Sequence, residues 1–159
     1  MSKDYTSIHK VSDENRLDFL PFYFGYHTQV VENMLFNIAQ EFIEEYEKGY
    51  WDFFKIDIID PKLPSSEAKS IPLLVWQEEQ EVTLLLVNYQ KEVVVRGLVA
   101  SVALNLMVFS HLASYFYEKN EKMTDVCTNI YHDLNQWVFS EENTLFTKEE
   151  LTTINNFID

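Results

Sequence analysis

The chain has 159 residues, and its 26 acidic side chains outnumber 12 basic ones to give a formal net charge of −14. That length fits a single domain, and the many aromatic residues argue against a disordered chain. Three glycines and four prolines exclude collagen-like and low-complexity classes. The single Cys127 excludes an intrachain disulfide. Because the first ten residues are polar and lack the apolar core of a signal peptide, we expect a cytoplasmic protein.

The N-terminal quarter divides into a polar tail and a segment rich in aromatic residues. Residues 1–15 are polar and predict a flexible terminus, which leaves residues 16–159 as one domain. From Arg16 to Gly25 the chain is dense in aromatic residues. Pro21 biases Leu20 away from helical backbone, so this segment is predicted to be an ordered, packed loop.

Residues 28–48 carry the pattern of an amphipathic helix. Thr28 is the expected N-cap, and Gly49 is the expected residue after the helix. Apolar side chains recur at spacings of three and four, namely Val31, Met34, Leu35, Ile38, Phe42 and Tyr46. Acidic side chains occupy the other face, namely Glu41, Glu44, Glu45 and Glu47. A solvated acidic face is a simpler interpretation of them than a carboxylate metal site.

After Gly49 the period of the apolar residues changes to two. Residues 54–58 alternate, and the apolar runs 71–77 and 81–90 are separated by a short polar turn that resembles a hairpin. A further run at 93–95 is rich in valine. The sequence therefore predicts a three- or four-stranded antiparallel sheet over residues 50–95.

Three helices are predicted in the C-terminal half, over residues 98–117, 124–139 and 148–158. The first is long enough to cross a membrane, but Asn105, His111 and three serines interrupt it, so a buried central helix is favoured. The last begins with Thr147 and Glu150 in a capping box. Together the segments predict a single α+β domain with an N-terminal amphipathic helix, a small antiparallel sheet and C-terminal helices.

No combination of residues predicts catalysis. Cys127 and His132 diverge by about 140° on a helix, and the adjacent Ser110 and His111 diverge by about 100°. No Gly-x-Ser-x-Gly or His-Glu-x-x-His motif is present, and three scattered glycines cannot form a phosphate-binding turn. We therefore expect no enzyme activity, no metal and no cofactor.

The acidity constrains the partners. An acidic surface repels both nucleic acid and anionic membranes, so direct binding to either is not expected, and a basic protein is the electrostatic complement. The charge of −14 would match only about seven base pairs of DNA, at one charge per roughly 1.7 Å. An acidic soluble protein is thus favoured over a DNA mimic, although mimicry of a short segment stays open.

Two blocks of residues resemble a known family. Arg16-x-x-Phe19-Leu20-Pro21-x-x-Phe24-Gly25 resembles the opening of the ArdB/KlcA antirestriction family, and Gly49-Tyr50-Trp51-Asp52-Phe53-Phe54 is similar to that family's Gly-Gly-Tyr-Trp-x-Phe-Tyr block. The helix containing Asn105 and the later Tyr131-His132-x-Leu134 also resemble family elements. Two features depart from the pattern: Lys48 replaces the first glycine of the pair, and residues 60–70 replace an Asn-Gly-Gly-Phe-Tyr stretch.

The resemblance implies a small cytoplasmic α+β protein of mobile genetic elements that protects incoming DNA from type I restriction enzymes without catalysis. Its partner would be the restriction enzyme complex or a host protein that controls it. The alternative is an acidic inhibitor or immunity-type protein for another basic nuclease or enzyme.

The candidate residues divide into a contact set and a packing set. The contact candidates are Arg16, Glu41, Glu44, Glu45 and Asp52. Arg16 and Asp52 could equally form an ion pair that closes the loop over the sheet. The other motif residues are predicted to act through packing, namely Phe19, Leu20, Pro21, Phe24, Gly25, Gly49, Tyr50, Trp51 and Phe53.

Overall fold

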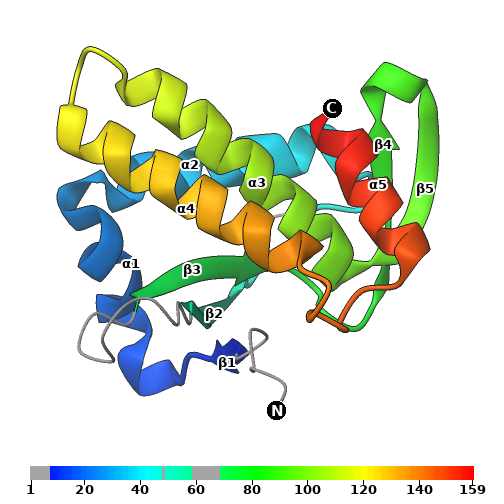
Figure 1. Cartoon of the computed structure of the whole chain (residues 1–159), viewed down its shortest axis with the longest axis horizontal. Coiled ribbons are helices and arrows are strands. Elements are labelled where there is room, and N and C mark those ends of the chain that lie inside the picture. Colours follow the sequence, from blue (N-terminus) through cyan, green and yellow to red (C-terminus); the bar gives the residue numbers. More distant parts are fainter. Residues whose placement is uncertain (1–7, 48, 59–68) are drawn as a thin grey trace.

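Helix α3 (Gly97–Phe116) runs through the middle of the molecule, and the other elements are arranged around it (Figure 1). The structure, a computed structural model, describes residues 8–47, 49–58 and 69–159. Side chains from Gly97 to Leu106 are all buried, and the predicted α+β single-domain fold is confirmed. By length and composition α3 could cross a membrane, but 72% of its most apolar window is buried inside the molecule. It is therefore a core helix, as predicted.

The other two C-terminal helices also confirm the prediction. Helix α4 (Glu121–Phe139) lies beside α3 as an antiparallel partner, and α5 (Lys148–Ile158) packs near the C-terminus (Figure 1). Helix α4 begins three residues before the predicted start because Asn120 caps it by accepting the Met123 N–H at 3.0 Å. The predicted capping box between Thr147 and Glu150 is present.

The strands form two small antiparallel sheets rather than one. The first sheet has the order β1-β2-β3, from β1 (Ile8–Lys10), β2 (Asp52–Ile58) and β3 (Lys69–Val75). The second pairs β4 (Glu81–Leu86) with β5 (Lys91–Arg96). The predicted hairpin between 71–77 and 81–90 is wrong. The chain reverses instead at η4 (Val87–Tyr89), where Gln90 takes left-handed backbone and starts β5 against β4.

The prediction of a flexible terminus over residues 1–15 is wrong for residues 8–15. Strand β1 pairs with β2 and places Lys10 opposite Phe54. A short 3-10 helix, η1 (Asp13–Asn15), then leads directly into the next helix. The pairing supplies backbone hydrogen bonds that the polar composition of this segment does not reveal. Residues 1–7 lie outside the described residues.

The aromatic segment predicted as a loop is helix α1 (Arg16–Phe24) with Pro21 inside it. Leu20 and Phe24 lie four residues apart, share one face and are buried. Burial of these two side chains outweighs the hydrogen bond that proline cannot donate. The helix ends at Gly25, whose φ of +56° suits a residue without a side chain. A 3-10 turn, η2 (Gly25–His27), follows.

Helix α2 (Thr28–Phe42) ends six residues before the predicted boundary. Ile43 is extended and bridges Leu84 of β4, and the Glu44 N–H bonds to the Thr83 carbonyl at 3.1 Å. The outer edge of β4 therefore captures the segment that would have continued the helix. The predicted residues at both ends of the helix are also wrong. His27 is the N-cap residue, while Thr28 donates its hydroxyl to the Gly25 carbonyl, and Gly49 lies well beyond the helix end.

Candidate functional site

The two motif blocks meet in the folded protein. The guanidinium carbon of Arg16, from the first block, lies 4.2 Å from the ring centre of Tyr50 and 4.1 Å from that of Phe53. Phe19, one turn further along α1, stacks on Phe53 with ring centres 5.8 Å apart. A cation over an aromatic face is attractive because the ring carries negative charge on its face. We call these residues, Arg16, Phe19, Tyr50 and Phe53, the block junction.

The Arg16–Asp52 ion pair, which the sequence left open as an alternative, does not form. Asp52 pairs with Lys10 of β1, with Nζ and Oδ1 3.4 Å apart. Arg16 instead lies over the two rings and close to Glu32 of α2. Burial raises the pKa of Glu32, and the nearby positive charge of Arg16 offsets part of that rise. Strand β1, which the sequence did not predict, thus supplies the cation for Asp52.

The remaining motif residues differ in exposure. Leu20, Phe24 and Trp51 are buried, and Trp51 donates its indole N–H to the Tyr46 hydroxyl at 3.1 Å. Pro21, Gly25, Gly49 and Tyr50 are exposed. The blocks therefore contribute both to the core and to the surface.

The three candidate acidic contact residues do not share one helix face. Glu41 lies in α2, whereas Glu44 and Glu45 follow its end. The carboxylate of Glu45 accepts hydrogen bonds from the Thr83 N–H at 2.7 Å and from the Thr83 hydroxyl at 2.8 Å. Burial acts to raise its pKa, but these bonds outweigh burial and the pKa is lowered. All three side chains are solvent-exposed, but only Glu45 is held at the β4 edge by hydrogen bonds.

Sequence reasoning missed an exposed apolar surface on α1 and η2. Leu17, Phe22 and Tyr26 are 88%, 79% and 96% exposed, and we call them the α1 rim. Exposed aromatic side chains such as Phe22 and Tyr26 are typical of interaction sites. A helical interpretation of this segment would have identified Phe22, because a residue two positions from buried Leu20 and Phe24 points to the opposite side.

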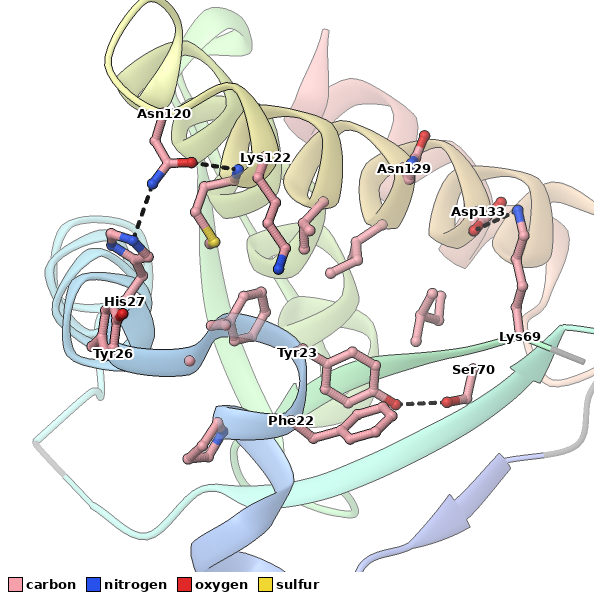
Figure 2. A pocket seen from close by; sticks show the side chains of 17 residues that line it. Phe22, Tyr23, Tyr26, His27, Lys69, Ser70, Asn120, Lys122, Asn129 and Asp133 are labelled. Carbon is pink, nitrogen blue, oxygen red and sulfur yellow. Dashed lines mark hydrogen bonds and ion pairs between the residues drawn. The ribbon is translucent and has the colours of Figure 1, made fainter. Parts of the chain in front are cut away.

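A groove of about 940 Å³ lies between the α1–η2 segment and α4 (Figure 2). Phe22, Tyr23 and Tyr26 line it on the α1 side. Helix α4 forms the facing wall, and the start of β3 closes one end. We call this feature the α1–α4 groove. The first motif block therefore contributes to a concave surface as well as to the block junction.

Pairs of polar side chains lie along this groove. The Tyr23 hydroxyl and Ser70 Oγ are 2.7 Å apart, and burial raises the pKa of Tyr23. At the β3 end, Lys69 Nζ lies 4.0 Å from the Asp133 carboxylate. Burial raises the pKa of Asp133, and the Lys69 charge offsets part of that rise. Figure 2 shows these pairs at one end of the groove and the Lys122 side chain reaching into it from α4.

Cys127 is fully buried, and desolvation raises the pKa of its thiol to about 12, so a nucleophilic thiolate is negligible near neutral pH. Among residues 8–47, 49–58 and 69–159, no group of three or more His, Cys, Asp or Glu side chains is placed to hold a metal ion.

The fold belongs to the α+β class and consists of two small antiparallel sheets and further helices around the buried central helix α3. A solved structure of the KlcA and ArdB proteins has this fold, with a TM-score of 0.64, 20% sequence identity and complete coverage of both chains. That structure is described as a novel fold with antirestriction activity against type I DNA restriction systems in vivo but not in vitro. No protein-family model matches the chain, and no curated protein matches it. The predicted resemblance is thus confirmed for the fold.

Proposed function

We propose that the protein is an antirestriction protein that lowers type I restriction of unmodified DNA in the cytoplasm through protein contacts, without catalysis. One observation carries the proposal: the chain shares its fold over its whole length with the KlcA and ArdB structure. The two resembling blocks support it because they meet in space at the block junction.

The α1 rim is the contact surface that best suits this function. Aromatic residues and arginine dominate the energy of protein interfaces, and Phe22, Tyr26 and Arg16 lie on one short segment. Glu41, Glu44 and Asp52 would add electrostatic selection for a basic partner. The partner would be a subunit of the restriction enzyme or a host protein that controls it.

The proposed mechanism does not use DNA. A net charge of −14 provides no basic stripe from which counterions could be released on binding phosphates. The purified protein should therefore leave duplex DNA unretarded at physiological salt. Tight binding to duplex DNA would contradict the mechanism even where protection is seen.

A plating experiment tests the function. Unmodified and modified phage are plated on a host with an active type I system, with and without the protein expressed. We expect expression to raise the plating of unmodified phage and to leave modified phage unchanged. Equal restriction, with soluble folded protein in the cells, would reject the proposal for that enzyme. The test is made in cells because the structural relatives are active in vivo but not in vitro.

The second candidate is an acidic inhibitor of another basic nuclease. It is favoured only by the exposed acids Glu41 and Glu44 and by the net charge. Isolation of tagged protein from the restricting host distinguishes the two. Recovery of restriction subunits or their regulators supports the first function, and recovery of an unrelated basic nuclease supports the second.

A further inference from the structure

The α1–α4 groove combines apolar walls with an unpaired positive charge. Phe22 and Tyr26 stand at its α1 side with most of their surface in solvent. Lys122 lies on the opposite wall, and within the described part of the chain its ammonium group forms no ion pair (Figure 2). Such a site offers apolar contact to one side chain and a charge to a neighbouring one.

The two ends of the groove differ in charge. Lys122 lies near the N-terminus of α4, and Asp133 lies eleven residues further along the same helix, a rise of about 16 Å. Asp133 is held by Lys69, so this end is close to neutral. The Lys122 end carries an uncompensated positive charge and adjoins the positive end of the α4 dipole. An anionic group is therefore favoured at that end alone.

The charged neighbours do not cancel this preference. Glu121 and Asp125 are the nearest acids on α4 in sequence, but neither lines the groove and neither forms an ion pair with Lys122. His27, from the α1 side, is engaged with the Asn120 amide at 3.2 Å. Lys69 and Lys122 against Asp133 give the groove lining a charge of +1, in a chain whose net charge is −14. The charge of the groove lining is thus opposite in sign to the net charge of the chain.

We propose that the α1–α4 groove binds a short polypeptide segment of a partner protein that carries a carboxylate next to a large apolar side chain. The carboxylate pairs with Lys122, and the apolar side chain packs between Phe22 and the apolar wall of α4. A groove about 16 Å long accommodates about five extended residues. The site does not depend on the proposed antirestriction function, because it follows from the lining residues alone.

Titration of the isotope-labelled full chain with two dipeptides, followed by NMR, tests the proposal. The probes are acetyl-Asp-Phe-amide and its neutral match acetyl-Asn-Phe-amide. We expect saturable shifts confined to amides of α1, η2, α4 and the start of β3, with the acidic peptide binding about two- to five-fold more tightly, as for an exposed ion pair. The preference should weaken as salt is raised.

Two lysine variants make the assignment specific. Lys122→Gln should remove the preference for the acidic peptide. Lys148→Gln is the matched control, because Lys148 is an exposed lysine in the first turn of another helix, α5. It should leave the preference unchanged. Absence of saturable binding, equal affinity for both peptides, a preference that survives Lys122→Gln, or shifts outside the groove would each overturn the proposal.

Discussion

The side-chain amide of Asn105 pairs with both backbone groups of Leu74. The Leu74 N–H donates to Asn105 Oδ1 at 3.1 Å, and Asn105 Nδ2 donates to the Leu74 carbonyl at 2.7 Å. Leu74 belongs to β3, whose other edge pairs with β2. A single side chain of α3 thus acts as a neighbouring strand would, and it satisfies buried polar groups at the free edge of the sheet.

Replacement of Asn105 should therefore destabilise the fold strongly. Asn105→Leu leaves a buried N–H and a buried carbonyl of Leu74 without partners, at a cost of about 1–3 kcal/mol for each group. We expect a loss of about 3 kcal/mol in the free energy of unfolding, measured by urea denaturation. The control is Asn37→Leu, an exposed asparagine in α2, which should change stability by about 0.5 kcal/mol or less. Equal effects of the two variants would contradict the role assigned to Asn105.

The same contact explains why the sheet was predicted wrongly. Ser101, one turn earlier on α3, accepts the Trp76 N–H at 2.9 Å, so the chain after β3 is also covered by side chains. Alternating apolar residues predict that a strand exists, but they do not predict which neighbouring segment pairs with the backbone N–H and C=O groups along its edge. Because α3 covers β3, β4 is free to pair with β5.

Sequence patterns correctly predicted the helices whose boundaries depend on neighbouring residues. The capping box at Thr147 and the apolar periodicity of α3 to α5 identified those helices, because each signal lies within the element it defines. The loop predicted from the local preference of Pro21 was wrong, because burial of Leu20 and Phe24, which favours the helix, is a tertiary effect. That error also concealed Phe22, so the α1 rim was missed while the motif residues were found.

Gly97 connects β5 to α3 with no room for a side chain. A Cβ atom there would lie 1.8 Å from the Gln77 carbonyl oxygen and 2.5 Å from that of Trp76. The backbone atoms of Trp76 and Gln77 cannot move aside without disrupting the structure. Gly97→Ala should therefore prevent folding or lower the free energy of unfolding by at least about 3 kcal/mol. Gly25→Ala is the comparison: nothing lies within 4 Å, and only its φ of +56° opposes a side chain, at about 1 kcal/mol. Thermal unfolding by circular dichroism should rank the two variants in that order.

The thiol of Cys127 should be inert in the native protein. Its side chain is fully buried, and desolvation raises its pKa to about 12, so almost no thiolate forms at pH 8. A colorimetric disulfide reagent should react with one thiol in denaturant and with almost none under native conditions. Rapid reaction of the folded protein would show that Cys127 is accessible and would make it a candidate nucleophile again.

Acidification should weaken the contact between Arg96 and Glu150. Arg96 Nε and Nη2 donate to the two carboxylate oxygens at 2.8 and 3.0 Å, and the Thr147 N–H donates to the same group. Burial acts to raise the pKa of Glu150, but these bonds lower it below its ordinary value of 4.5. A lowered pKa in the folded state gives stability that is present above pH 4.5 and lost as the pH falls through the folded-state value.

The variant Glu150→Gln provides the measurement for that contact. Denaturation from pH 7 to pH 3 should show a smaller acid-induced loss of stability in Glu150→Gln than in the original protein. The matched control is Glu149→Gln, an exposed neighbour in the same helical turn, which should follow the original pH profile. Parallel profiles for the Glu150 variant and the original protein would show that Glu150 does not contribute to acid sensitivity.

The α1 rim gives the most direct test of how the proposed function works. Phe22→Ser and Tyr26→Ser remove side chains that are 79% and 96% exposed, so the double variant should fold with a stability change of about 0.5 kcal/mol or less. Aromatic anchors of an interface each contribute about 2 kcal/mol or more, so protection of unmodified phage should fall at least tenfold. Val87→Ser, at an exposed apolar residue of η4 at the opposite end of the molecule, should protect as well as the original protein (Figure 1). Full protection by the folded double variant would remove Phe22 and Tyr26 from the mechanism and make Glu41 and Glu44 the next residues to replace.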